Sequence, residues 1–260
     1  MDILEELKKY YENEGLEDLR LRADGQQHLE FLTAAKYIEK YLAPGSKILD
    51  SCAGSGIYSF YFAGKGHAVT AGDIVPFNVE IIREKQQAAP VLSEVYLGDA
   101  RELPQFGDGT FDAVLCMGAL YHLLEAGGRN EVISESLRLI KDEGLFVFTY
   151  LNRYAVILND SRGSLNNIDE ILTFAKEGKE GIFYASHPSE MENLFKGLGI
   201  EKLCHVALDG MANFMHGTAK LINDVGIKKW QKYHFEVCEE YSLLGTSYHN
   251  MFIGRKKPPA

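Results

Sequence analysis

Short apolar runs alternate with longer amphipathic stretches through residues 46–150 of the chain. The runs KILDS, AVTAGD, VYLGD, FDAVLCM and GLFVFTY are each bounded by Gly, Asp or Pro, which is typical of buried strands. Between these runs, the spacing of apolar residues predicts helices near residues 57–64, 76–89 and 130–140. This alternation predicts an α/β fold, in which a mostly parallel sheet carries helices on both faces.

Helical patterns flank this alternation on both sides. An opening helix presents one apolar face, and residues 31–42 form a second apolar stripe that ends before a Pro-Gly pair. After the fifth predicted strand, residues 152–182 are helical in pattern but polar, and residues 211–238 are helical again. The stretch MENLFKGLGIEKLCHVALDG between them predicts a helix, a turn and a strand, and SLLGTSYHNMFIGRKK predicts an edge strand. A single domain over residues 1–260 accounts for these elements.

Composition narrows the class of protein. Hydrophobic residues make up 46% of the chain, which suffices for a core without disulfide or metal staples. The four cysteines lie far apart with no histidine at zinc spacing, so we expect no metal site and a reducing, cytoplasmic environment. The net charge of -10 disfavours a nucleic-acid substrate, because it repels phosphate backbones. No apolar run reaches membrane-spanning length, and the acidic N-terminus does not resemble a signal peptide, so we expect no membrane partner.

The loop after the first predicted strand carries the most informative chemistry. The strand ends at Asp50, a loop of small residues with Gly54 and Gly56 follows, and a helix then begins. Glycines let the backbone approach a ligand closely, and the helix N-terminus offers free N–H groups. The second predicted strand ends at Asp73, whose carboxylate suits the two hydroxyls of a ribose. These residues predict a nucleoside cofactor site; the alternative is that Asp50 caps the helix and the glycines only form a turn.

Two nucleoside cofactors use loops of this kind. A nicotinamide dinucleotide prefers a third glycine or an alanine where this chain has Ser59, and Asp50 would repel its pyrophosphate. S-adenosylmethionine has no phosphate and carries an ammonium and a sulfonium, both of which a carboxylate attracts. The loop therefore favours S-adenosylmethionine as the cofactor.

Four segments, ILDSCAGSG, VTAGD, YLGDARELP and FDAVLCMGALYHL, occur in this order over residues 46–150. With these segments the chain resembles the class I S-adenosylmethionine-dependent methyltransferases, and its flanks resemble a bacterial subgroup of small-molecule-type methyltransferases. The resemblance implies a Rossmann-like, mostly parallel sheet of seven strands whose last strand is antiparallel. It also implies transfer of a methyl group to a small-molecule acceptor by in-line displacement, in which positioning supplies much of the rate.

The same resemblance implies which residues bind the cofactor. They are Asp50, Cys52, Gly54 and Gly56 for the methionine part, Asp73 and Ile74 for the ribose, Asp99 and Ala100 for the adenine, and Cys116 and Met117 beside the sulfonium. The chain departs from the family at Cys52, which replaces the usual first glycine of the loop and narrows the expected pocket. Two alternatives stay open: Asp99 starts a turn before Arg101, and Cys116 is an ordinary buried thiol.

Tyr121 and His122 follow the fourth predicted strand by a few residues, at the rim where strand ends meet ligands. We predict that both are catalytic, and that His122 is the general base, because the pKa of an ordinary histidine lies near neutrality. The alternative is that His122 caps or packs a helix.

In related proteins a helix lies over the cofactor, so the resemblance implies that residues 1–43 form an N-terminal helical cover. Within it, Glu30 and Phe31 are interpreted as helix surface and core. Residues 152–182 and 211–238 interrupt the alternation, and long insertions at strand ends commonly form lids. We predict that both are helical insertions over the acceptor pocket; the alternative is that they extend the core.

Two other functions stay open from the sequence. One is a nicotinamide-dependent oxidoreductase, against which Asp50 and Ser59 argue. The other is a non-catalytic module that binds S-adenosylmethionine without transferring its methyl group.

Overall fold

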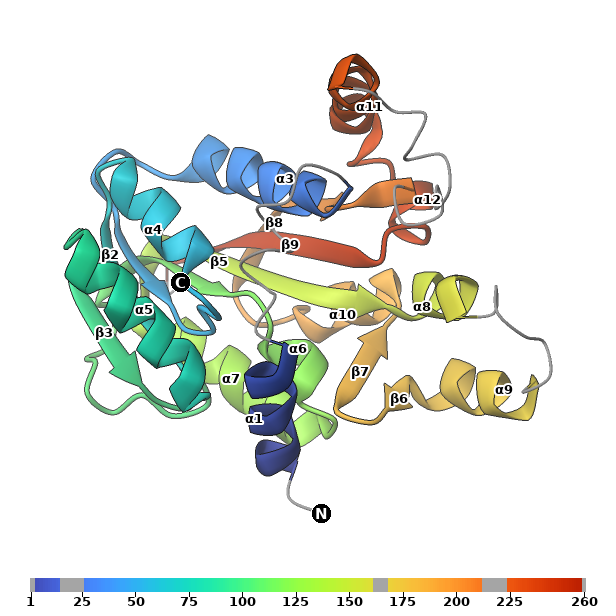
Figure 1. Ribbon diagram of the computed structural model, residues 1–260, viewed down its shortest axis with the longest axis horizontal. Coiled ribbons are helices and arrows are strands. Elements are labelled where there is room, and N and C mark those ends of the chain that lie inside the picture. The colour runs from blue at the N-terminus through green and yellow to red at the C-terminus, as the bar shows by residue number, and fades with distance from the viewer. Residues whose placement is uncertain (1–2, 15–25, 161–167, 212–223, 259–260) are drawn as a thin grey trace.

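In the part of the chain that the structure describes, seven strands form the central sheet in the order β3-β2-β1-β4-β5-β9-β8 (Figure 1). The computed structural model describes residues 3–14, 26–160, 168–211 and 224–258. Strands β1 to β5 pair in parallel, and β9 runs antiparallel between β5 and β8. The strands are β1 (Lys47–Asp50), β2 (Ala68–Asp73), β3 (Glu94–Leu97), β4 (Phe111–Cys116), β5 (Ile140–Asn152), β8 (Ile200–Ala207) and β9 (His249–Lys256).

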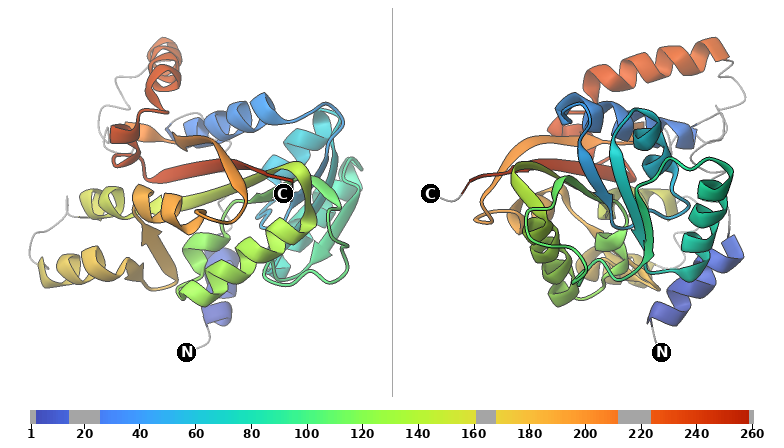
Figure 2. Two further views of the ribbon diagram at one scale, coloured as in Figure 1. Left: turned by 180° about the vertical axis from the view of Figure 1, so that it is seen from behind. Right: turned by 90° about the vertical axis from the view of Figure 1, so that its left-hand side faces the viewer.

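Helices cover both faces of this sheet, as Figures 1 and 2 show from opposite sides. One face packs against α3 (Gln26–Tyr41), α4 (Ile57–Gly64) and α5 (Pro76–Ala88), and the other against α7 (Ala126–Leu139) and α10 (Pro188–Leu194). The remaining helices are α1 (Ile3–Glu14), α6 (Ala119–His122), α8 (Arg153–Asp160), α9 (Ile168–Glu177), α11 (Asp224–Val237) and α12 (Tyr241–Leu244). Within the described ranges, no helix combines the length and the apolar character that crossing a bilayer requires.

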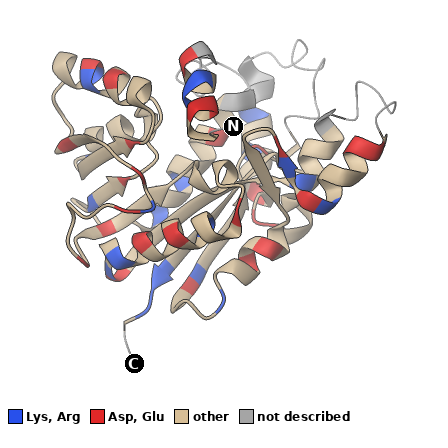
Figure 3. Cartoon of the chain, turned by 90° about the horizontal axis from the view of Figure 1, so that it is seen from below, with Lys and Arg blue, Asp and Glu red and all other residues tan. Residues whose placement is uncertain are grey.

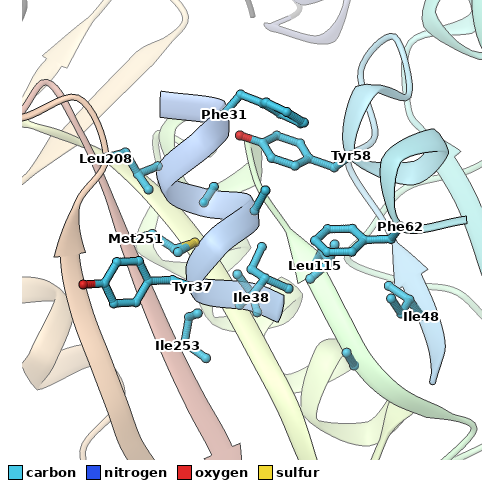
Figure 4. Packing of buried hydrophobic residues seen from close by; sticks show 14 of the residues in the cluster. Phe31, Tyr37, Ile38, Ile48, Tyr58, Phe62, Leu115, Leu208, Met251 and Ile253 are labelled. Atoms are coloured by element: carbon cyan, nitrogen blue, oxygen red, sulfur yellow. The ribbon is translucent and has the colours of Figure 1, made fainter. Parts of the chain in front are cut away.

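The apolar runs of the sequence become strands because their successive side chains point to opposite faces of the sheet. In β1, Ile48 packs with α3 and α4, as Figure 4 shows, whereas Leu49 packs on the side of α7. In β5, Val147 joins the first core and Phe146 joins the second. Strands β1 and β5 are therefore buried on both faces, and the parallel pairing of β1 to β5 confirms the predicted mostly parallel sheet with helices on both faces.

The expectation of an edge strand at the end of the chain is wrong. Strand β9 pairs with β5 on one side and with β8 on the other, so β8 forms the edge. The physical reason lies in the run of Met251, Phe252 and Ile253, which are 0%, 2% and 0% exposed. Consecutive apolar residues bury both faces of a strand, which is typical of an interior position.

Two short strands extend the sheet beyond the predicted seven. They are β6 (Lys179–Glu180) and β7 (Phe183–Ser186), which form an antiparallel hairpin, and β7 pairs in parallel with the last residues of β5. The first predicted insertion, residues 152–182, thus contains α8, α9 and β6, although residues 161–167 lie outside the described residues. Of the second insertion, residues 212–223 also lie outside them, and α11 follows.

We expect Gly72→Ala to destabilise the protein by about 1–3 kcal/mol, because an added methyl group would overpack the core. A Cβ at Gly72 in β2 would overlap the ring of Tyr96. That ring is 8% exposed and packs edge-on against Phe106, so it has little room to move. Urea unfolding measures the free energy. The control is Gly64→Ala at the end of α4, where a Cβ meets nothing within 4 Å and stability should not fall. Equal stability of the two variants would contradict the packing argument.

Candidate active site

A cavity of about 370 Å³ lies at the carboxyl edge of the sheet, where the ends of several parallel strands meet. Its volume is in the range of small-molecule sites. Strand ends and the loops after them supply one wall, with residues 51–55 after β1, Asp73 in β2, residues 99–101 after β3 and residues 117–119 after β4. Helix α1, beside α6 in Figure 1, supplies the opposite wall through Ile3, Leu4, Leu7 and Tyr11.

Asp50 lies behind the loop rather than in the cavity wall. It is buried, and its carboxylate accepts a hydrogen bond of 2.6 Å from the Ser59 hydroxyl on α4. Burial raises the pKa of Asp50 to about 7, and the hydrogen bond from Ser59 opposes this rise. Gly56 is also behind the wall, with a φ of 85°, and a Cβ there would lie 3.0 Å from Ile82. Asp50 and Gly56 therefore support the loop from beneath.

Asp73 joins the loop to β2 and lines the cavity together with Ile74. Its Oδ2 accepts a hydrogen bond from the Gly54 N–H at 2.9 Å, and Oδ1 accepts one from the Val75 N–H at 2.9 Å. The Asn78 side chain also donates to Oδ1, at 3.2 Å. Burial raises the pKa of Asp73, and these donors oppose the rise. The carboxylate is thus held in one orientation at the cavity, as a group that binds a diol requires.

Asp99 and Ala100 line the cavity on the turn after β3. The Asp99 carboxylate accepts the backbone N–H of Arg101 at 2.9 Å and pairs with its guanidinium at 2.6 Å. Burial raises the pKa of Asp99, but Arg101 outweighs burial and holds the pKa below its ordinary value. Asp99 therefore forms the turn that the sequence left open as an alternative, and it also borders the cavity.

Two cysteines lie at the ends of the neighbouring strands β1 and β4. Cys52 and Met117 line the cavity, whereas Cys116 is buried behind it. The two thiol sulfurs are 3.7 Å apart, and this contact, followed by burial, raises the pKa of Cys52. Cys52 is therefore a neutral thiol, and it lines the cavity without closing it.

The cavity also receives Tyr121 and His122 from α6, as expected from their place after the fourth strand. Both ring nitrogens of His122 contact the protein, because Nε2 lies 2.9 Å from the Tyr11 hydroxyl and Nδ1 lies 3.3 Å from the Ile182 carbonyl oxygen. Burial lowers the pKa of His122 to about 4. The ring is therefore neutral near pH 7, and these contacts suit the closing of the cavity better than the removal of a proton.

Sequence reasoning missed that α1 reaches this histidine. Leu7 packs with Val75 and Ile182, and the ring of Tyr10 meets that of Phe183 at 5.5 Å. The apolar face of α1 was visible in the sequence, but the separation of 111 residues between Tyr11 and His122 left no local signal. In the part of the chain that the structure describes, the residues of the two predicted insertions do not line the cavity, although Ile182 contacts His122.

The described residues that line the cavity carry more acidic than basic side chains. Asp73, Asp99 and Glu125 are acidic, and Arg101 is the single lysine or arginine among them, with its guanidinium held by Asp99. A pyrophosphate would be repelled by this wall, whereas a cationic ligand would be attracted. The cavity-lining residues Ala100, Leu123 and Val132 belong to one apolar cluster and suit the faces of a purine. The residues present therefore fit an adenosyl group that carries positive charge.

Comparisons with known proteins show similarity to one family in the central part of the chain. The family described as "Methyltransferase domain" matches residues 49–148. The ubiquinone biosynthesis O-methyltransferase of Xanthomonas campestris pv. campestris (strain B100) is 31% identical over 135 residues, which cover 50% of this chain and 55% of that protein. The chain thus spans about half the length of the curated relatives it matches.

Solved structures share the fold at low sequence identity. A SAM-dependent methyltransferase from Methanosarcina mazei is similar with a TM-score of 0.61 at 18% identity, covering 86% of this chain and 98% of that chain. The 1,6-didemethyltoxoflavin-N1-methyltransferase of Burkholderia thailandensis, solved with 1,6-didemethyltoxoflavin and S-adenosylhomocysteine, gives 0.58 at 14%, covering 97% and 88%. These likenesses agree with the Rossmann-like fold class that the sequence predicts.

Proposed function

We propose that the protein transfers a methyl group from S-adenosylmethionine to a small-molecule acceptor, since residues 49–148 match the family described as "Methyltransferase domain". The observation that carries the proposal is the acidic wall of the cavity, in which Asp73 and Asp99 stand at successive strand ends. When bound, S-adenosylmethionine would supply a methyl group carried on a sulfonium. The sulfur would leave as a neutral thioether, so the transfer requires no nucleophile from the protein.

The proposal gives each part of the cavity wall a role. Asp73 binds the ribose hydroxyls, and its hydrogen bonds from the Gly54 and Val75 N–H groups fix the carboxylate for that contact. Asp99 and Ala100 hold the adenine, and residues 51–55 hold the methionine part. Asp50 supports this loop from behind. In-line geometry at the methyl group then depends on how rigidly these contacts hold the donor.

The methyl group is expected beside Met117, at the end of β4, with Cys116 in the layer behind it. Helix α1 covers part of this region, because the Tyr11 hydroxyl lies 2.9 Å from His122 Nε2 and both side chains line the cavity. A dry, closed site strengthens electrostatic interactions with the donor and prevents hydrolysis. We assign Tyr121 and His122 to the boundary between the donor and the acceptor.

The acceptor and its surroundings are part of the same proposal. A small molecule with a hydroxyl group is supported by the similarity to an O-methyltransferase over half of the chain. A nucleic-acid acceptor is disfavoured by the net charge of -10, and acidic and basic side chains are interspersed in Figure 3.

The wide spacing of the cysteines along the chain supports a cytoplasmic location. We retain residues 1–43 as a cover for the donor.

We also propose that residues 152–182 and 211–238 cover the acceptor. Support comes from Ile182, whose carbonyl oxygen lies 3.3 Å from His122 Nδ1 at the cavity. Support also comes from the apolar surface that the first insertion exposes: Tyr154, Ile168 and Leu172 are each about half exposed. Exposed apolar side chains of this kind are available to pack on a ligand or on another part of the chain.

We expect S-adenosylmethionine, or S-adenosylhomocysteine, to stabilise the protein by about 2.7 kcal/mol when its concentration is 100 times the dissociation constant. For a chain of this size, that energy raises the melting temperature by roughly 5–10 °C. Differential scanning fluorimetry measures the shift, and NADH at the same concentration is the control. A shift with NADH alone, or no shift with millimolar S-adenosylmethionine, would exclude the proposed function.

A further inference from the structure

Two of the four cysteines of the chain lie together at the cavity. Cys52 follows β1 and Cys116 ends β4, and their sulfurs are 3.7 Å apart. Strands β1 and β4 are parallel neighbours with Asp50 opposite Leu115, so the two cysteines stand at the same end of the pair. Their separation of 64 residues along the chain left no local signal of this contact. The proposed methyl transfer requires neither thiol.

The cavity is the route by which a small molecule reaches the two thiols. Cys52 belongs to the cavity wall, whereas Cys116 is 0% exposed. Both belong to the second core, in which Cys116 is a buried member and Cys52 packs against it. A Cβ at Gly118, just after β4, would lie 3.7 Å from the Cβ of Cys52, so the end of β4 also lies against Cys52. A reagent in the cavity therefore meets Cys52 first and Cys116 behind it.

The separation of the two sulfurs suits one atom that is bonded to both. Metal–sulfur bonds are about 2.3 Å long in zinc sites, so two sulfurs on one centre of that size lie at most about 4.6 Å apart. The observed 3.7 Å falls within this limit. A structural zinc ion needs four ligands, and within the described ranges no third histidine, cysteine or carboxylate joins the two thiols in a metal-binding group. The pair therefore suits a thiophilic centre that needs only two protein sulfurs and brings its remaining ligand with it.

The protonation state of Cys52 favours a reaction that consumes the thiol together with its proton. The contact with Cys116, followed by burial, raises the pKa of Cys52, so the thiolate is scarce near pH 7. Thiol–disulfide exchange requires a thiolate. Condensation with an arsenic–oxygen bond does not require one, because the thiol proton leaves with the oxygen. The product is neutral and lies against the apolar second core, so no charge is buried.

We propose that Cys52 and Cys116 form a two-thiol site that binds organic trivalent arsenicals and thereby excludes the methyl donor. In an arsine oxide, the arsenic–oxygen double bond breaks and two arsenic–sulfur bonds form. The two thiol protons leave with the oxygen as one molecule of water. Arsenic stays trivalent and neither sulfur is oxidised, so no oxidant or reductant takes part. The two-thiol site goes beyond the proposed function, and only the exclusion of the donor rests on that function.

The bound arsenical competes with the donor for space. Its organic group cannot enter the packed layer behind Cys52, where Cys116 is buried, so it extends into the cavity. Residues 51–55, which include Cys52, are the part of the wall assigned above to the methionine part of the donor. Because coupling between two ligands is reciprocal, the bound donor should protect the two thiols to the same extent.

The test uses phenylarsine oxide as the probe, added to the reduced, full-length protein after the reductant has been removed. We expect one phenylarsenic group per chain by intact mass, and two of the four cysteines should resist alkylation after unfolding. Dithiothreitol should release the group. The same concentration of thiol groups from 2-mercaptoethanol should not, because two sulfurs on one chain act at a high effective concentration. Release by the monothiol, or absence of the adduct, would overturn the two-thiol site.

Four variants locate the site. Cys52→Ser and Cys116→Ala should each lose the adduct that resists the monothiol. Cys204→Ser and Cys238→Ser are the matched controls and should bind the probe as the wild type does, because Cys204 is buried in the first core and Cys238 Sγ lies 3.3 Å from the Tyr37 hydroxyl. If Cys116→Ala does not fold, Cys52→Ser decides. Retention of the adduct in Cys52→Ser, or its loss in a folded Cys204→Ser variant, would contradict the assignment.

Protection by the donor product tests the second half of the proposal. S-adenosylhomocysteine at 100 times its dissociation constant leaves about 1% of the chains free, so it should slow labelling by about 100-fold. The labelled protein should in turn lose its thermal shift with S-adenosylhomocysteine. If the unlabelled protein shows that shift but is labelled at an unchanged rate, exclusion of the donor is wrong. Absence of the shift in unlabelled protein would reject methyl transfer and donor exclusion together, whereas the count of protected thiols would still decide the two-thiol site.

Discussion

We expect Asp73→Ala to weaken the binding of S-adenosylmethionine by roughly 10- to 150-fold, because a hydrogen bond to a charged group contributes about 1.5–3 kcal/mol. Asp73 faces the cavity from the end of β2, and it also accepts the N–H groups of Gly54 and Val75. The variant therefore loses the contact with the ribose and the support of the loop. Isothermal titration calorimetry measures the dissociation constant.

Two further variants show which loss matters. Asp112→Ala removes a carboxylate that accepts the Lys47 N–H at 2.7 Å, but at the opposite edge of the sheet, so the affinity should not change. Asp73→Asn keeps the volume of the side chain and one oxygen acceptor for the loop, so it should fold normally and still bind weakly. Wild-type affinity in either Asp73 variant would show that this residue only forms a turn.

We expect Phe146→Ala to destabilise the protein by about 3–5 kcal/mol, because it leaves a cavity in the core. Phe146 is 0% exposed in β5, and its ring centroid lies 4.2 Å from that of Phe148 and 5.1 Å from that of Phe195 on the α10 side. Three aromatic rings in mutual contact cannot close the space left by one of them without moving the helix. Chemical denaturation gives the free energy of unfolding.

The matched control removes a large apolar side chain from the surface. Leu97 ends β3 and is 52% exposed, so Leu97→Ala should change stability by less than about 0.5 kcal/mol. Phe146 lies away from the cavity, so its variant should keep wild-type affinity for S-adenosylhomocysteine below its melting temperature. A loss of less than about 1 kcal/mol for Phe146→Ala would mean that the core closes around the gap.

Local patterns were sufficient to predict most of the fold. Helices predicted at 57–64, 76–89 and 130–140 correspond to α4, α5 and α7, because each lies between two apolar runs that set its limits. The site loop was also predictable, since Asp50 and Gly56 occupy fixed places relative to a strand and a helix. The position of Asp50 and Gly56 behind the cavity wall could not be predicted, because a sequence does not show which side of a loop a ligand occupies.

Features that depend on contacts between distant segments were not predictable. Tyr11 meets His122, and Asp209 meets His249, through pairings that only the folded sheet creates. The interior position of β9 was likewise not predictable, because packing and chain connections set the order of strands in a sheet. Glu30 was interpreted as a surface position of its helix, but it is buried, and the start of β9 lies beside it through His249.

The interior position of β9 also affects the order in which the domain assembles during synthesis. Strands β2 to β5 each pair, as they are made, with a strand that already exists, whereas β1 waits for β2 and β4. Strand β8, in contrast, leaves the ribosome before the strand that joins it to β5. Residues 200–207 must therefore wait, with their edges unpaired, until residues 249–256 emerge, and exposed strand edges of this kind are prone to aggregate. We infer that the last strand closes the nascent sheet, and that a nascent chain stalled before residue 249 would depend on chaperones.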